Sequence, residues 1–210
     1  MRAARRTGPT TDSRPRKARE GLETYLHSFY TWALARHGAR HGRAAGVAGA
    51  LGALLPDVPA ILGTVYYVGP AFLADGWSAM DSEGVIEAIY FTAPFGAAGR
   101  ALHSALPPLV LLALYALLRG ARRLDGRRVG LWFLLGWLGH AGVDFLTHAE
   151  NVRPLFWPLS GWTWSSPVSY YDPEHYGREF FRASHGLALL LMLALLGRRV
   201  IRLNDEKRQV

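Results

Sequence analysis

Apolar residues dominate one long stretch in the first third of the chain. Residues 44–74 contain a single charged side chain, that of Asp57. Such a run exceeds the ~20 residues that an α-helix needs to cross a bilayer, so it predicts a transmembrane helix over about residues 45–68. We expect this helix to break at Pro56 and Pro59, because proline removes a hydrogen-bond donor and clashes with the preceding turn.

Three further apolar runs follow, at about residues 102–118, 129–147 and 183–197. The last run is short for a span and suits a tilted or buried helix as well. Upstream, apolar residues recur at helical spacing from Leu22 to Leu34, which predicts an amphipathic helix on the membrane or on the bundle. The expected fold is all-α: a multi-pass membrane helical bundle with about four transmembrane helices and an N-terminal amphipathic helix.

Charge sets the expected organisation of the chain. Residues 1–19 hold seven Arg or Lys, one Asp and little to bury, which predicts a disordered basic arm. Residues 20–43 then form the amphipathic helix and a basic turn, 44–203 a membrane-embedded helical domain, and 204–210 a charged tail.

The basic residues also predict an orientation. The net charge is +8, and twenty of the 24 Lys and Arg lie in residues 1–43, 119–128 and 198–210. Four spans place these three segments on one side, which is cytoplasmic by the positive-inside rule. We therefore expect a multi-pass protein of the cell membrane with cytoplasmic N- and C-termini. Its basicity indicates membrane lipids as partners, and no nucleic acid.

The third apolar run carries the most informative polar pattern. His140, Asp144 and His148 follow one another at a spacing of four, which places them on one face of a helix. Because the chain has no cysteine, a metal site must use His, Asp and Glu, a donor set that suits zinc, with manganese or iron as alternatives. Satisfied interior residues or helix caps are the other interpretation.

Other ionisable groups fall at the same predicted depth. Asp57 lies beside the expected helix break, where it is costly unless paired, protonated or bound to a cation, or where it simply caps the second half-helix. His103 and His185 begin predicted spans from the outer side. One polar site in the outer half of the bundle explains these groups better than separate accidents do. The aromatic residues of segment 154–181 predict an interfacial belt or a substrate mouth, and Glu174 and His175 are further candidates from that loop.

Three pieces of the sequence together resemble the YdjM-like family of membrane-bound, metal-dependent hydrolases. These are LLPDVP at 54–59, HS at 103–104 and GHAGVDFLTHAENVRPLFWPLS at 139–160. The resemblance covers residues 44–160 and implies metal-site roles for four residues: Asp57, His103, His140 and Asp144. That family also has a histidine before its LPD motif. In this chain three residues compete for that place: His27, His37 and His41.

The sequence thus predicts an integral membrane metal-dependent hydrolase that acts on an ester or phosphoester of a lipid or lipid-linked substrate. The expected ligands of a divalent ion are Asp57, His103, His140, Asp144, His148 and His185. Among these, Asp57, Asp144 and His148 are the expected catalytic residues, in water activation and proton transfer. The alternative is a non-enzymatic membrane protein, either for metal handling or transport, or a structural partner-binding protein whose His and Asp residues pack the helices.

Overall fold

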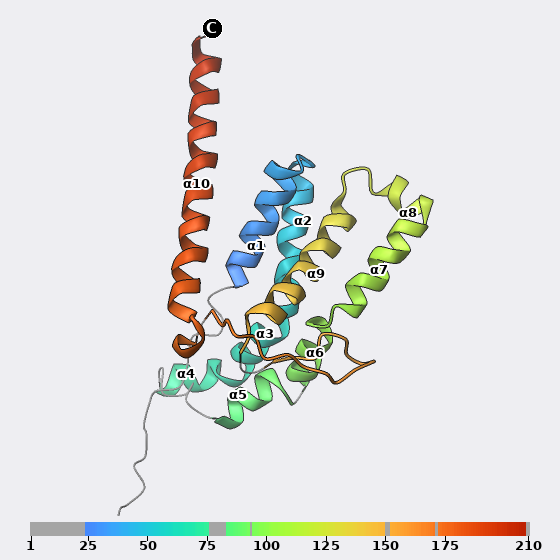
Figure 1. Cartoon of the computed structure of the whole chain (residues 1–210), viewed down its shortest axis with the longest axis vertical. Helices are drawn as coiled ribbons and strands as arrows, with labels where there is room; N and C mark the ends of the chain where they lie inside the picture. Colours follow the sequence, from blue (N-terminus) through green and yellow to red (C-terminus); the bar gives the residue numbers. More distant parts are fainter. Residues whose placement is uncertain (1–23, 76–82, 93, 150–151, 171, 209–210) are drawn as a thin grey trace, which may run out of the picture.

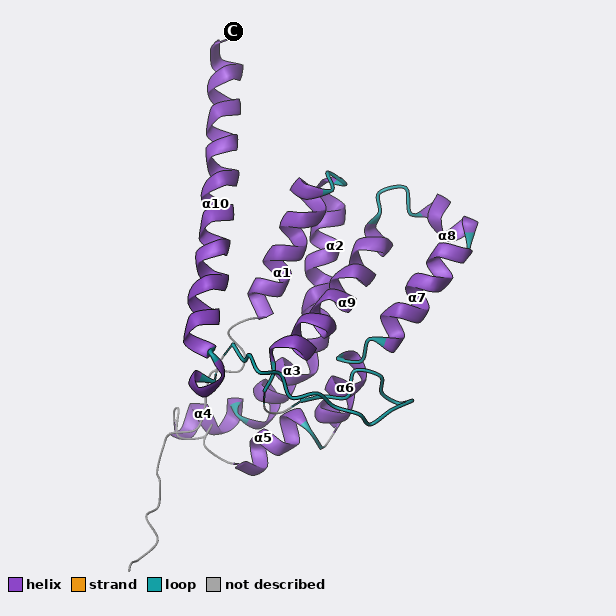
Figure 2. Ribbon diagram, viewed as in Figure 1, coloured by secondary structure: helices purple, strands orange, loops and turns teal. Residues whose placement is uncertain are grey.

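The computed structural model describes residues 24–75, 83–92, 94–149, 152–170 and 172–208. The predicted arm at residues 1–19 lies outside these ranges. Helices and loops, with no strand, make up the described part (Figure 2). The all-α prediction is therefore confirmed.

Four helices lie side by side and form the main body of the molecule (Figure 1). They are α1 (Thr24–Ala33), α2 (Gly42–Leu54), α7 (Leu106–Leu117) and α9 (Val129–Thr147). α2 packs between α1 and α9, and α7 packs on the other side of α9. α1 continues into a π-helical turn, η1 (Leu34–Gly38), before the chain turns into α2.

The first long apolar run breaks where its two prolines predict. A 3-10 turn, η2 (Leu55–Asp57), joins α2 to α3 (Val58–Tyr67), and Pro56 and Pro59 are both buried there. The run Gly42–Tyr67 is nevertheless long and apolar enough to cross a membrane. So is Val129–Thr147, which has the bounds that the sequence predicts for the third span.

Fewer helices pass this test than the four spans predicted. Besides those two, α6 (Pro94–Leu102) and α7 qualify only as a pair, and they bend by 45° at the break that holds His103. The expected fourth span belongs to α10 (Gly177–Arg208), which begins and ends in charged residues. Its uncharged stretch between Arg182 and Arg198 is shorter than the ~20 residues of a span. The part of the chain that the structure describes therefore has two candidate spans, or three with the bent pair.

The remaining elements lie at the two ends of the body. α4 (Gly69–Asp75), α5 (Glu83–Tyr90) and α6 gather at one end, where the loop after α9 and a 3-10 turn, η4 (Pro173–His175), also run (Figure 1). α8 (Arg119–Leu124) lies at the other end. α10 runs past α1 and extends beyond the body, and the predicted charged tail from residue 204 continues this helix as far as Arg208.

Two glycines allow α2 and α9 to approach backbone to backbone. A Cβ atom on Gly52 would lie 1.9 Å from the carbonyl oxygen of Phe133, and one on Gly136 would lie 2.1 Å from that of Gly49. Both separations are impossible for a side chain, so only glycine fits at either position. This close contact brings main-chain oxygens of α2 within reach of side chains on α9.

Candidate metal centre

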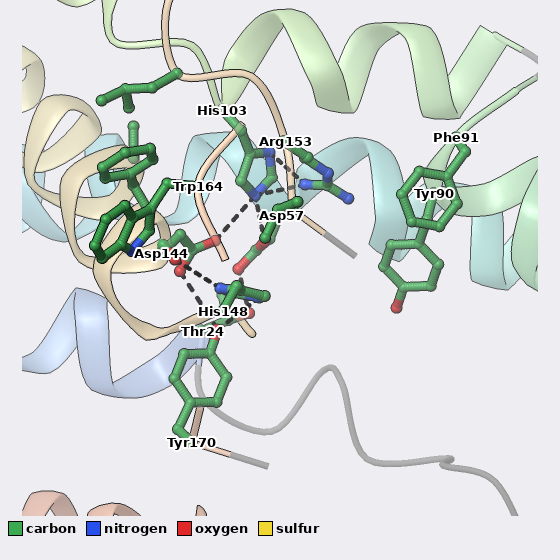
Figure 3. A pocket seen from close by; sticks show the side chains of 14 residues that line it. Thr24, Asp57, Tyr90, Phe91, His103, Asp144, His148, Arg153, Trp164 and Tyr170 are labelled. Carbon is green, nitrogen blue, oxygen red and sulfur yellow. Dashed lines mark hydrogen bonds and ion pairs between the residues drawn. The ribbon is translucent and has the colours of Figure 1, made fainter. Parts of the chain in front are cut away.

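Four side chains from three distant segments meet at the lower end of the body. Asp57 comes from η2, His103 from the break between α6 and α7, and His140 and Asp144 from successive turns of α9. Each offers one ligand atom, and these atoms all lie within 4.8 Å of one another. Figure 3 shows Asp57, His103 and Asp144 converging on one spot. We call these four residues the His/Asp cluster.

Five of the six distances among the ligand atoms of the His/Asp cluster are close to the edge lengths of one regular tetrahedron. Nε2 of His140 lies 3.1 Å from Oδ2 of Asp144 and 3.5 Å from Oδ1 of Asp57. Nε2 of His103 lies 3.3 Å and 3.4 Å from the same two oxygens. The two Nε2 atoms are 3.3 Å apart. The centre of a tetrahedron with such edges is about 2 Å from each corner, the length of a bond from zinc to histidine nitrogen or carboxylate oxygen.

Main-chain hydrogen bonds orient both imidazoles. Nδ1–H of His140 donates to the carbonyl oxygen of Ala53 at 2.7 Å, and Nδ1–H of His103 donates to that of Gly99 at 2.8 Å. Each Nε2 atom therefore turns its lone pair toward the cluster in the neutral ring. Metal-binding histidines are oriented in this way, by a hydrogen bond from the nitrogen that does not bind the ion.

Because the two carboxylates are largely buried, a nearby positive charge is needed to stabilise them. His140 is 1% and His103 5% exposed, and the side chains of Asp144 and Asp57 are 13% and 21% exposed. Carboxylates in such surroundings are costly without a positive partner. Protonation of both imidazoles would supply two charges, yet it would also point two N–H donors at each other across 3.3 Å. A divalent ion between the four atoms removes that conflict.

Three members of the His/Asp cluster, Asp57, His103 and Asp144, line an open cleft. The loop after α9 supplies much of the opposite wall, including Arg153, Trp164 and Tyr170. The hydroxyl of Tyr170 donates to Oδ1 of Asp144 at 3.3 Å. The structure thus places these two aromatic residues of the segment in the wall of the cleft. His175, by contrast, pairs with Asp172 at 2.8 Å, outside the cluster.

His148, a predicted ligand, lines the cleft but is not one of the four corners. Its Nδ1–H donates to the main-chain oxygen of Asp144 at 2.8 Å, and its Nε2 atom lies 3.4 Å from the hydroxyl of Tyr170. Burial lowers the pKa of His148 below its usual value, and the charge of Asp144 offsets only part of that effect.

His185, also a predicted ligand, lies elsewhere. Its ring stacks on Phe181 with 3.8 Å between centroids, and its Nε2 atom is hydrogen-bonded to the hydroxyl of Tyr25. α10 starts at Gly177 rather than near residue 183, so His185 lies two turns into the helix, on the side that faces α1. The prediction that His185 joins the other ligands is therefore not met.

One of the three early histidines reaches the cluster. His27 lies with its Nε2 atom 3.3 Å from Oδ1 of Asp144, and its ring centroid is 4.4 Å from that of His140. His41 instead accepts a hydrogen bond from Nε1 of Trp132 at 2.8 Å, and His37 packs edge-on against Trp32. The sequence held a signal for this choice, because only His27 lies on or beside the apolar stripe of its helix.

The serine of the His-Ser pair has a structural role. Ser104 is fully buried, and its hydroxyl donates to the carbonyl oxygen of Trp157 at 2.7 Å and lies 3.1 Å from that of Leu155. The amide of Ala105 donates to Leu155 as well, at 2.8 Å. These hydrogen bonds hold two segments that are about fifty residues apart in the sequence against each other beside His103.

Comparison of the chain with protein-family models, curated proteins and solved structures finds no match. The geometry of the cluster and the cleft is therefore the basis for its function. It describes a divalent metal site beside helices that are long and apolar enough to cross a membrane, which fits a membrane-associated protein.

Proposed function

We propose that this protein is an integral membrane metal-dependent hydrolase. Its ion is zinc, with manganese or iron as alternatives, and the four members of the His/Asp cluster bind it. One observation carries the proposal: the Nε2 atoms of two imidazoles point toward two largely buried carboxylates, while their Nδ1–H groups are held by main-chain oxygens. The resemblance to the YdjM-like hydrolases supports the same four ligands.

Asp57, His103, His140 and Asp144 would hold the ion, and a divalent ion bound there would lower the pKa of a bound water and polarise the group to be cleaved. The protein supplies the proton acceptors. Oδ1 of Asp144 faces the cleft wall at Tyr170 and His27, outside the four corners, and is placed to accept a proton from water. His148 lies on the other side of the Tyr170 hydroxyl and relays that proton. Asp57 keeps its position through a hydrogen bond from Thr24.

The reaction is hydrolysis of an ester or phosphoester. The water oxygen forms a bond to the acyl carbon or the phosphorus atom, and the bond from that atom to the leaving oxygen breaks. One proton of the water goes to the carboxylate, and a proton returns to the leaving oxygen, which gives an acid and an alcohol. A cleft among membrane-spanning helices with an aromatic mouth favours a lipid or lipid-linked substrate.

The orientation we propose rests on the basic segments and on α10 crossing the membrane beside the other helices despite its short uncharged stretch: a multi-pass protein of the cell membrane, both termini cytoplasmic, and the cleft toward the outer face. Reporter fusions test it directly. A reporter placed after Gly126 should be cytoplasmic, and one placed within residues 160–175 should be external. The opposite pattern would reverse the orientation and leave the cluster intact.

Metal content is the decisive measurement for the proposed function. Elemental analysis of the detergent-purified protein should find close to one zinc, manganese or iron ion per chain. A double variant, His140→Ala with Asp144→Ala, should lose it, whereas His175→Ala should keep it because His175 pairs with Asp172 away from the cluster. A parent protein without metal, even after incubation with these ions, would make the cluster a set of helix-packing contacts.

A further inference from the structure

Arg153 is the cation nearest to the His/Asp cluster among the residues that line the cleft (Figure 3). Its Nη1 atom lies 2.5 Å from Nδ1 and 2.7 Å from Nε2 of His103. A position in the ring plane at these two distances would overlap the ring carbons, so Nη1 lies over the ring. The guanidinium therefore lies against the face of His103.

Neither nitrogen of His103 is a suitable acceptor for Arg153. The Nδ1 atom carries the proton that it donates to Gly99, and the lone pair of Nε2 points at the cluster. The guanidinium also lies over the ring of Tyr90, with Cζ of Arg153 5.7 Å from the centre of that ring. Within the described ranges no carboxylate pairs with Arg153, so its N–H donors are available to a ligand in the cleft.

The net charge of the site favours an anionic ligand. A divalent ion and the carboxylates of Asp57 and Asp144 together carry no net charge, and the adjacent guanidinium adds one positive charge. An uncharged ester leaves this charge unbalanced in a partly buried cleft, whereas an anion neutralises it. Planar guanidinium groups pair best with carboxylate and phosphate oxygens, through two parallel hydrogen bonds.

Hydrogen bonds anchor the loop that carries Arg153. This residue lies two residues before Leu155, whose carbonyl oxygen accepts from the amide of Ala105 and lies beside the hydroxyl of Ser104. The guanidinium also packs beside Gly99, where a Cβ atom would be in ordinary van der Waals contact with Nη2 at 3.8 Å. The guanidinium is therefore held beside the cluster before any ligand arrives, which is how binding sites limit the entropy cost of recognition.

We propose that the substrate carries a phosphoryl group and that Arg153 binds a non-bridging oxygen of this group while the group reaches the His/Asp cluster. This rests on the proposed function and narrows it from esters in general to phosphoesters. The oxygens of one tetrahedral phosphoryl group are close together. One of them can therefore bind the guanidinium while another reaches the cluster beside Nε2 of His103, which lies 2.7 Å from Nη1. Arg153 is thus the binding residue that selects the substrate.

Calorimetric titration of inorganic phosphate into the zinc-loaded, detergent-purified protein tests the proposal. Zinc content is measured first on every sample. Arg153→Gln should keep its zinc and bind phosphate roughly ten- to a hundredfold more weakly, the cost of losing hydrogen bonds to a charged group. Arg153→Lys keeps the charge but loses the planar fork, and should fall between the two. Arg119→Gln, in α8 at the other end of the body, is the matched control and should bind as the parent does.

The outcomes separate the two proposals. A parent that holds no zinc, manganese or iron, even after incubation with these ions, contradicts the proposed function. A zinc-loaded parent that fails to bind phosphate, or binds acetate equally well, contradicts only the phosphoryl proposal, as does unchanged phosphate binding in Arg153→Gln. Should Arg153→Gln fail to fold, Arg153→Lys decides: phosphate binding equal to that of the parent overturns the proposal.

Discussion

The ring of His140 reaches from α9 to α2, where its Nδ1–H donates to the main-chain oxygen of Ala53 at 2.7 Å. Ala53 directly follows Gly52, and Gly136 lies one turn before His140, so the hydrogen bond forms at the closest contact of the two helices. Helix packing and ligand orientation are therefore one feature of this molecule.

A side chain at this contact should disturb both properties. The Cβ atom in Gly136→Ala would lie 2.1 Å from the carbonyl oxygen of Gly49, so the helices must separate, at a cost of about 1–3 kcal/mol in the free energy of unfolding. Gly139→Ala is the control in the same helix. Its Cβ atom meets nothing within 4 Å, and alanine is the better helix former, so stability should be unchanged or rise by up to about 1 kcal/mol.

Thermal unfolding in detergent, together with zinc content, measures the effect. Gly136→Ala should unfold at a lower temperature and bind zinc more weakly because His140 moves with its helix. Equal unfolding temperatures for the two alanine variants would show that α2 and α9 do not pack as closely as described.

His27 should support the metal site without being one of its four corners. Its Nε2 atom contacts Asp144, and its ring lies against His140. His27→Ala should therefore keep one metal ion per chain but lower the affinity about tenfold, as the loss of a group that orients metal ligands does. His41→Ala removes a histidine that contacts Trp132 instead, and should leave metal affinity unchanged. Competition with a zinc chelator measures both, and equal affinities for the two variants would remove His27 from the site.

Asp125 gives a pH dependence that is independent of the metal. Its Oδ2 atom accepts hydrogen bonds from the amide of Leu131 at 3.0 Å and the hydroxyl of Tyr115 at 3.1 Å, at the start of α9. Burial disfavours the charged carboxylate, but hydrogen bonds from main-chain amides outweigh it and lower the pKa of Asp125 below its usual value. Because the pKa is lower in the folded than in the unfolded protein, ionised Asp125 stabilises the fold above the unfolded value of about 4.

Asp125→Asn keeps an oxygen that can accept these hydrogen bonds but removes the charge, and should cost about 0.3–1 kcal/mol of stability at neutral pH, the usual contribution of a carboxylate at the N-terminus of a helix. The difference from the parent should shrink below about pH 4 and vanish once the parent carboxyl is protonated. Parallel thermal unfolding of the two proteins between pH 3 and pH 7 measures this. A difference that stays constant over the whole range would contradict the role of the charge.

Much of the arrangement could be predicted because it depends on short stretches of sequence. The bounds of α9 follow from an apolar run between charged and polar residues, and the break at η2 follows from Pro56 and Pro59. His140 and Asp144 share a face of α9 because they are four residues apart. Their partners, Asp57 and His103, were predicted from the expected depth of each group in the bundle and from the family resemblance.

The rest depends on contacts between segments that no local pattern describes. His27 and His185 both lie on apolar helices, yet only the helix of His27 packs against α2, while His185 turns toward Tyr25. Arg153 was not singled out, because its importance comes from a loop fastened to Ser104. The number of candidate spans is smaller than predicted because α6 and α7 bend at their break and because the uncharged stretch of α10 is short.

The corners of the His/Asp cluster come from η2, the α6–α7 break and α9, three places far apart along the chain. An ion held by all three would act as a cross-link that closes two long loops, so its binding free energy would add to the stability of the whole bundle. Both the activity of the protein and its lifetime in the cell would then depend on the concentration of the ion. Without the ion the helix bundle would be less stable and more easily cleaved by proteases. Metal availability would in this way set how much of the protein the membrane retains.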